Sequence, residues 1–175
     1  MERSGKEALD LLIKAGLAYK IYHTSAQGVP LGAQIKSNQF KVISFDIGIH
    51  QRVIGLDLAE YVLAQSFNQI NKGNLAEIYV GQQLIAMHSS HKLFSVYYWH
   101  RESQSSNAEI DYLLQNNETV VPIEVKAGTK GQMQSMYIFM QERDCTKGIR
   151  VSMENFSTYD HIQTIPLYAV NRILK

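Results

Sequence analysis

The sequence predicts a mixed α/β fold, in which helices flank a sheet built around a β-hairpin. Residues 108–114 alternate apolar and polar side chains, a polar turn follows at 115–118, and residues 119–126 alternate again. Successive side chains of a strand point to opposite faces, so this pattern predicts two antiparallel strands. Helical periodicity at 132–143 and a strand at 148–152 then form a crossover, which places the last strand parallel to the second hairpin strand.

Size and composition restrict the class of protein. A chain of 175 residues with 45% hydrophobic content suits one domain, or one domain with a small appendage. Its net charge of +1 gives no global argument for nucleic-acid binding, which would need a local patch. The single cysteine, Cys145, excludes an intramolecular disulfide, and no apolar run approaches the roughly 18–20 residues of a membrane span. The start of the chain is not a signal peptide, so we expect a cytoplasmic protein.

In the first 70 residues, the sequence pattern predicts a helix and a hairpin. Ser4 to Glu7 has the pattern of a capping box, and Gly16 marks the end of the helix that it opens. The expected elements are a helix at 5–15, strands at 17–23 and 40–45, an exposed and mobile loop at 24–39, and a helix at 57–70.

This segment is typical of a winged-helix-like appendage that contacts DNA or docks onto a neighbouring domain. Lys36 and Lys41 are too few to form a basic stripe, so docking is the interpretation we favour. The appendage covers residues 1–70, and the core covers residues 71–175.

The core is expected to open with a helix at 75–88, followed by a strand at 93–101. Asn74 has the character of an N-cap, which puts Glu77 at the position where a glutamate completes a capping box. Glu77 also shares a face with Gly81 and Leu84, which turns it toward the interior. Both interpretations of Glu77 stay open. On the later helix we expect the inward side chains to be Met133, Met136, Tyr137 and Met140.

The hairpin carries a candidate metal site. Period 2 places Glu124 and Lys126 on one face of their strand, and Asp111 can meet Glu124 from the first strand. Two carboxylates bind a hard divalent cation, and an ammonium group stabilises a water nucleophile or the charge that develops on phosphorus. We therefore expect Mg²⁺ or Mn²⁺ between Asp111 and Glu124, with the Val125 carbonyl as a further ligand and Lys126 as the catalytic cation. The alternative is an exposed Glu124–Lys126 pair that contributes ~0–1 kcal/mol.

The spacing Asp111, twelve residues, Glu124, one residue, Lys126 resembles the core of the PD-(D/E)XK nuclease superfamily, although Ile110 stands where the superfamily name has proline. Together with this hairpin, further segments resemble the C-terminal domain of unknown function 4143 found behind AAA+-type ATPase modules in prokaryotes. These segments are 40–48, with the pattern K-x-x-x-x-D-x-G, 73–80, 97–101, 108–111 and 122–128. The resemblance implies a restriction-endonuclease-like mixed sheet flanked by helices, and it makes Glu77 an accessory acid of the site.

Other chemistry has weaker support. No G-x-x-x-x-G-K-[ST] phosphate loop occurs, so we expect no ATPase activity from this chain. His88 and His91 lack two further zinc ligands at a suitable spacing, and Cys145 has an acidic neighbour that disfavours the thiolate. Gln132, Gln134 and Tyr137 are candidates for support of the site by resemblance, but their spacing departs from Q-x-x-x-Y.

Two functions follow as expectations. The first is a Mg²⁺- or Mn²⁺-dependent phosphodiesterase that acts on DNA or RNA. The second is a non-catalytic module with a nuclease-like fold that binds nucleic acid or protein and regulates an AAA+ ATPase, either in the same chain or in another. The complete set of two acids and a lysine favours the first, and the near-neutral charge favours the second.

Overall fold

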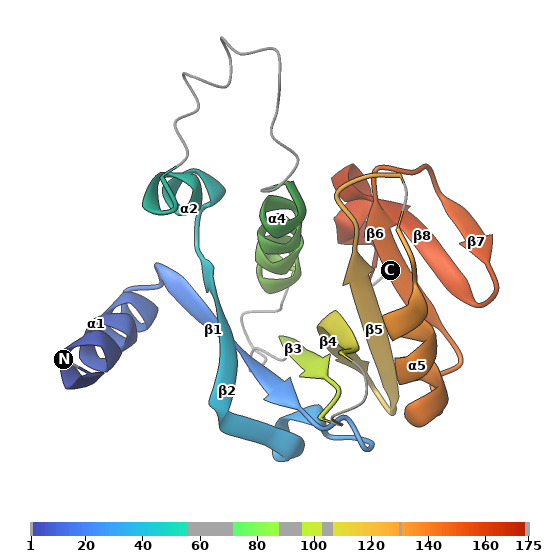
Figure 1. The fold of residues 1–175 in the computed structure, drawn as a ribbon, viewed down its shortest axis with the longest axis horizontal. Helices are drawn as coiled ribbons and strands as arrows, with labels where there is room; N and C mark the ends of the chain where they lie inside the picture. Colours follow the sequence, from blue (N-terminus) through green and yellow to red (C-terminus); the bar gives the residue numbers. More distant parts are fainter. Residues whose placement is uncertain (1, 56–71, 88–95, 103–106, 130, 174–175) are drawn as a thin grey trace, which may run out of the picture.

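A single eight-stranded mixed sheet organises the computed structural model, which describes residues 2–55, 72–87, 96–102, 107–129 and 131–173. The strand order is β2-β1-β3-β4-β5-β6-β8-β7 (Figure 1). The strands are β1 (Ala18–Thr24), β2 (Ile35–Ser44), β3 (Val96–His100), β4 (Glu109–Asn116), β5 (Thr119–Val125), β6 (Gly148–Ser152), β7 (Ser157–Tyr159) and β8 (Ile162–Pro166). The helices are α1 (Glu2–Lys14), α2 (Ile47–Val53), α4 (Lys72–Ala86) and α5 (Gln134–Glu142), with short 3₁₀ segments η1 (Leu31–Gln34) and η3 (Leu167–Arg172).

The central hairpin and the crossover are confirmed. Strands β4 and β5 are antiparallel, with Tyr112 opposite Ile123, and a turn at Asn117 connects them in a left-handed conformation (φ 54°). The pairing of the two strands ends at Tyr112 and Ile123, next to a register shift between β3 and β4 that falls between Ile110 and Leu113. Strand β6 covers the predicted residues and pairs in parallel with β5.

Helices α4 and α5 cover opposite faces of the sheet. Tyr112 and Leu114 of β4 pack with the buried face of α4, whereas Leu113, between them, packs with Met136 and Phe139 of α5. The sheet is therefore buried on both sides at β4. On α5, the expectation that Tyr137 points inward is wrong, because Tyr137 is 39% exposed and Phe139 takes the buried position.

The N-terminal helix begins earlier than predicted. Helix α1 starts at Glu2, so Ser4 lies inside the helix and the proposed capping box is wrong. Its C-terminal end is confirmed: Gly16 has a φ of 72°, and the N–H of Leu17 donates to the Leu12 carbonyl. In Figure 1, α1 lies at the outer end of the sheet, beyond β1 and β2.

The first two strands belong to the same sheet as the strands of the predicted core. β1 pairs antiparallel with β2 on one side and parallel with β3 on the other. The division of the chain at residue 70 stays a prediction, and the structure joins the strands from both parts through β1 and β3. The predicted helix at 57–70, the end of the helix at His88 and the start of the strand at 93–95 lie outside the described residues.

The loop predicted at 24–39 is partly structured. It contains η1, and β2 begins at Ile35, five residues before the predicted strand. Ala26 and Leu31 are buried, and the N–H of Leu31 donates to Oε1 of Gln115 at 3.0 Å. The expectation of an exposed loop is therefore wrong at these positions, because the loop packs against β4.

Asp46, from the K-x-x-x-x-D-x-G segment, has a structural role. It is the N-cap of α2, and its Oδ1 accepts a 2.8 Å hydrogen bond from the N–H of Ile49. Along the described stretches, we find no helix long and apolar enough to cross a membrane.

Candidate active site

The Asp111 carboxylate lies between the two central strands. Its Oδ2 accepts a 2.7 Å hydrogen bond from the backbone N–H of Val125, so the side chain on β4 is held by the backbone of β5. The structure thus brings together Asp111 and Val125, which were both predicted as metal ligands. Whether the Val125 carbonyl binds an ion stays a prediction.

Glu124 is buried and only half satisfied. The side chain of Lys126 donates from Nζ to Glu124 Oε1 at 2.6 Å, while Oε2 has no hydrogen-bond partner among the described residues. Glu124 is 6% exposed, so water does not readily supply the hydrogen bond that Oε2 lacks. A buried carboxylate oxygen without a partner costs free energy, and a bound cation removes that cost. The alternative of an exposed Glu124–Lys126 pair is wrong, because the glutamate is inside the protein.

The two carboxylates resist full ionisation together. Burial raises the pKa of Asp111 to about 8, and the negative charges of Glu124 and Glu77 act in the same direction. Burial also raises the pKa of Glu124, although Lys126 opposes the shift. A proton or a cation therefore stabilises the pair near neutral pH.

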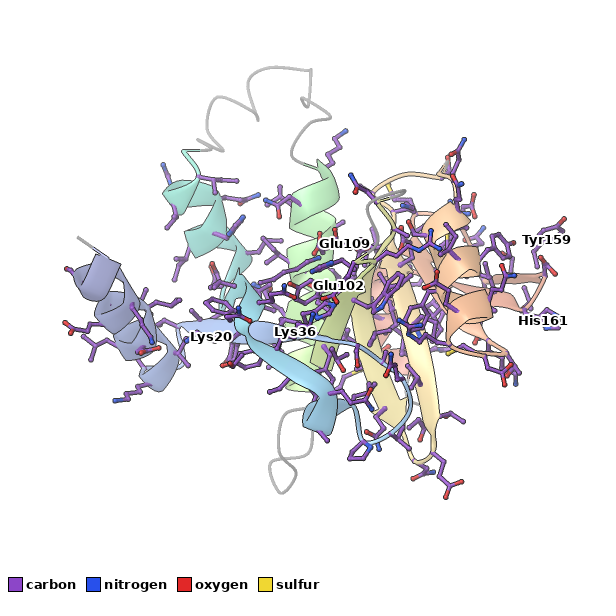
Figure 2. All side chains as sticks on the ribbon, turned by 60° about the horizontal axis from the view of Figure 1, so that its bottom comes forward. Lys20, Lys36, Glu102, Glu109, Tyr159 and His161 are labelled. Atoms are coloured by element: carbon purple, nitrogen blue, oxygen red, sulfur yellow. The ribbon has the colours of Figure 1, made fainter. Side chains whose placement is uncertain are left out.

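Lys41 of β2 is a member of this site that sequence analysis missed. Its Nζ lies 3.0 Å from Oε1 of Glu77 and also pairs with Glu109 at the start of β4. Burial alone would lower the pKa of Lys41, but the Glu77 and Glu109 carboxylates raise it. Figure 2 shows Glu109 near the middle of the molecule. The only sequence signal for Lys41 was its place as the lysine of the K-x-x-x-x-D-x-G pattern, on which the resemblance of residues 40–48 rests.

Glu77 faces the site and does not complete a capping box. Helix α4 begins at Lys72, so Asn74 lies inside its first turn, and the predicted N-cap is wrong. Nδ2 of Asn74 is instead 3.4 Å from Nε2 of His50. The Glu77 side chain is bound by Lys41, and its charge acts on Asp111. Its role as an accessory acid stays a prediction.

Tyr112 fixes helix α4 against the hairpin. Its hydroxyl donates a 2.8 Å hydrogen bond to the backbone carbonyl of Glu77. The ring reaches the helix at Gly81, where a Cβ atom would meet the Tyr112 ring and hydroxyl closer than van der Waals contact allows. Tyr112 follows Asp111 directly in β4, so one strand positions both an acid of the site and the helix that carries Glu77.

A family model, described as Domain of unknown function (DUF4143), matches residues 72–170. This chain belongs to the DUF4143 family. No curated protein and no solved structure is significantly similar to it. The DUF4143 segment extends from α4 into η3 and includes Glu77, Asp111, Glu124 and Lys126. Lys41 lies outside this segment, so the site of this DUF4143 protein also draws on its N-terminal strands.

The predicted supporting residues lie on the surface, at α5 and just before it. Gln132, Gln134 and Tyr137 are exposed. Partial burial raises the pKa of Tyr137, and the charge and hydrogen bond of its neighbour Asp160 act in the same direction. Gly131 has a closer connection to the site, because a Cβ there would lie 2.9 Å from Cδ of Lys126. The absence of a side chain at Gly131 leaves room for the stem of Lys126.

Proposed function

We propose that this chain is a nuclease-like C-terminal domain of an AAA+ ATPase system, with a divalent-metal-dependent phosphodiesterase site for nucleic acid. The observation that carries the proposal is the unpartnered, buried Oε2 of Glu124, beside an Asp111 whose pKa is raised to about 8. A structural ion pair has no need of a second buried acid, whereas a metal site does.

The donor set fits a hard cation. Asp111 and Glu124 supply the carboxylate oxygens, Val125 supplies a carbonyl and Glu77 is an accessory acid. A Mg²⁺ or Mn²⁺ ion held there would supply charge neutralisation at the phosphate and activation of the attacking water. Lys126 stabilises negative charge that develops on the phosphate, and Glu124 Oε1 positions its ammonium for this role.

The second candidate is a non-catalytic module that binds nucleic acid or protein and regulates an ATPase. One observation favours it: both lysines near the carboxylates are already engaged, Lys126 by Glu124 and Lys41 by Glu77 and Glu109. Phosphate binding would have to compete with these ion pairs. The net charge of +1 adds no long-range attraction for a polyanion.

Calorimetric titration of the full chain with Mn²⁺ tests the metal site. We expect one ion per chain, no binding to Glu124→Gln, and unchanged binding to Glu118→Gln, a control at an exposed glutamate of the β4–β5 turn. The absence of Mn²⁺ binding in the unmodified chain, at a pH above 8, would overturn the metal site and with it the phosphodiesterase.

Cleavage assays on single- and double-stranded DNA and RNA separate the two candidates. For the phosphodiesterase, cleavage requires Mg²⁺ or Mn²⁺, and Lys126→Met lowers its rate by about 100-fold while Mn²⁺ still binds. Cleavage that survives Asp111→Asn would identify a contaminating nuclease. Metal binding without cleavage, combined with metal-independent binding of nucleic acid or an AAA+ protein, would favour the regulatory module.

A further inference from the structure

Two parallel strands bring histidines and a glutamate together away from the carboxylate site. Strand β1 pairs with β3 so that His23 is opposite Tyr98, near the end of both strands. The ring centroids of His23 and His100 are 4.3 Å apart. One ligand atom each from His23, His100 and Glu102 lies within 4.8 Å of the others.

We propose that His23, His100 and Glu102 form a binding site for one divalent transition-metal ion of the Zn²⁺ class. Two imidazoles and one carboxylate are a donor set of zinc sites, and three protein ligands leave a fourth position for water or another ligand. This donor set differs from the all-oxygen set at Asp111 and Glu124, so the two sites select different ions.

The hydrogen bonding of His23 prepares it as a ligand. The ring is buried (1% exposed), and its Nε2 lies 3.3 Å from the carbonyl oxygen of His100. A carbonyl only accepts, so this contact requires the proton on Nε2 and leaves the lone pair on Nδ1. Nδ1 has no partner among the described residues. Metal-binding histidines commonly donate their other ring N–H to a backbone carbonyl in this way.

The cluster is accessible to an ion. A cavity of about 260 Å³ is lined by His23, His100 and Glu102, together with Trp99 and Arg143 on its wall. The cavity gives the metal an entry path and gives the open coordination position space for a small ligand.

Small side-chain movements complete the geometry. Tetrahedral Zn²⁺ with ligand bonds near 2.0–2.1 Å places its ligand atoms about 3.4 Å apart, so separations up to 4.8 Å must shorten. Glu102 follows β3, and half of its side-chain surface is exposed, which leaves it free to turn. It pairs with Lys36, and both residues are labelled in Figure 2. An exposed ion pair of this kind is weak. Lys36 therefore competes with the metal for the glutamate.

The test is Zn²⁺ and Co²⁺ binding to the untagged full chain, carried out in a Glu124→Gln background to remove the carboxylate site. We expect one Zn²⁺ per chain and Co²⁺ absorption bands typical of nitrogen ligation at low coordination number. His100→Gln and Glu102→Gln each lower Zn²⁺ affinity at least tenfold, since even residues that only support ligands change affinity by roughly 10–100-fold. Lys36→Met raises the affinity, because it removes the competing ammonium.

His161→Gln is the matched control, a substitution at an exposed histidine that lies far from Glu102 in Figure 2. It leaves Zn²⁺ affinity unchanged. Equal affinities in the parent, His100→Gln and Glu102→Gln proteins would overturn the proposal, as would a loss of binding confined to His161→Gln. Because the background lacks Glu124, neither result depends on the phosphodiesterase.

Discussion

The backbone N–H of Val125 donates a 2.7 Å hydrogen bond to Oδ2 of Asp111, so the position of an acid on one strand depends on the backbone of the next. The bond occupies one Asp111 oxygen and lowers the pKa of the carboxyl, but burial and the neighbouring acids outweigh it. The hydrogen bond therefore orients the Asp111 side chain, while burial and the neighbouring acids disfavour its ionised form. This combination is useful in a group that is to bind a cation.

Asp111 should contribute to the free energy of unfolding of the metal-free protein, and this contribution should fall as the pH rises. The folded pKa is about 8 and the unfolded pKa about 3.9, so the folded state holds the extra proton between these values. The stabilising term is fully present below about pH 4 and is lost by about pH 8, at no more than ~1.4 kcal/mol per pH unit. Urea unfolding of Asp111→Asn and the parent protein at a series of pH values measures this term as a difference. A difference that is constant from pH 4 to 8 would contradict the buried, protonated aspartate.

Mn²⁺ affinity should rise over the same range. Binding displaces the proton that the carboxylates hold, so affinity increases up to about tenfold per pH unit and levels off above pH 8. Calorimetry in buffers of different ionisation enthalpy counts the released protons. Affinity that does not vary with pH, with no proton release, would show that the metal binds elsewhere.

Gly81→Ala should destabilise the protein although alanine is the better helix former. The added methyl group meets the ring and hydroxyl of Tyr112, and such overpacking costs roughly 1–3 kcal/mol. Gly73→Ala, in the same helix, is the control: a Cβ there has nothing within 4 Å, so the change is neutral or stabilises by up to about 1 kcal/mol. Denaturant unfolding of the two variants distinguishes these outcomes. Similar free energies of unfolding for both variants would mean that Tyr112 moves aside freely.

Lys41→Met should lower the free energy of unfolding of the metal-free protein and raise its affinity for Mn²⁺. The substitution leaves Glu77 and Glu109 without their shared cation, at a cost of roughly 1–3 kcal/mol. It also removes a positive charge that competes with the metal, so affinity measured above pH 8 increases. Thermal unfolding with and without Mn²⁺ checks both effects, and the ion should restore more stability to the variant than to the parent. Weaker Mn²⁺ binding in the variant would assign Lys41 a supporting role at the metal site.

The sequence predicted the parts of the fold that depend on local pattern. The β4–β5 hairpin, β6 and α5 follow from alternation, turn residues and helical periodicity within about 45 residues of chain. The same alternation assigned Val121, Ile123 and Val125 to one face, and these three side chains do pack together in the core on the α4 side.

The remaining relationships depend on contacts between distant segments. Lys41 and Glu77 are 36 residues apart, and His23 and His100 are 77 apart, so no local pattern marks them as neighbours. The parallel pairing of β1 with β3 brings His23 to His100, and the packing of α4 on β2 brings Glu77 to Lys41. The predicted capping boxes at Ser4 and Asn74 were wrong for a different reason: the same residues also occur inside helices that begin earlier.

The place of β1 in the sheet has a consequence for how the family segment folds. Residues 72–170 contain β3 but neither β1 nor β2. Without β1, the outer backbone N–H and C=O groups of β3 would become an open edge, beside the buried Tyr98 and Trp99. Open apolar edges recruit strands from other molecules, so a fragment cut at residue 72 is expected to aggregate. The N-terminal strands thus protect the family segment from self-association.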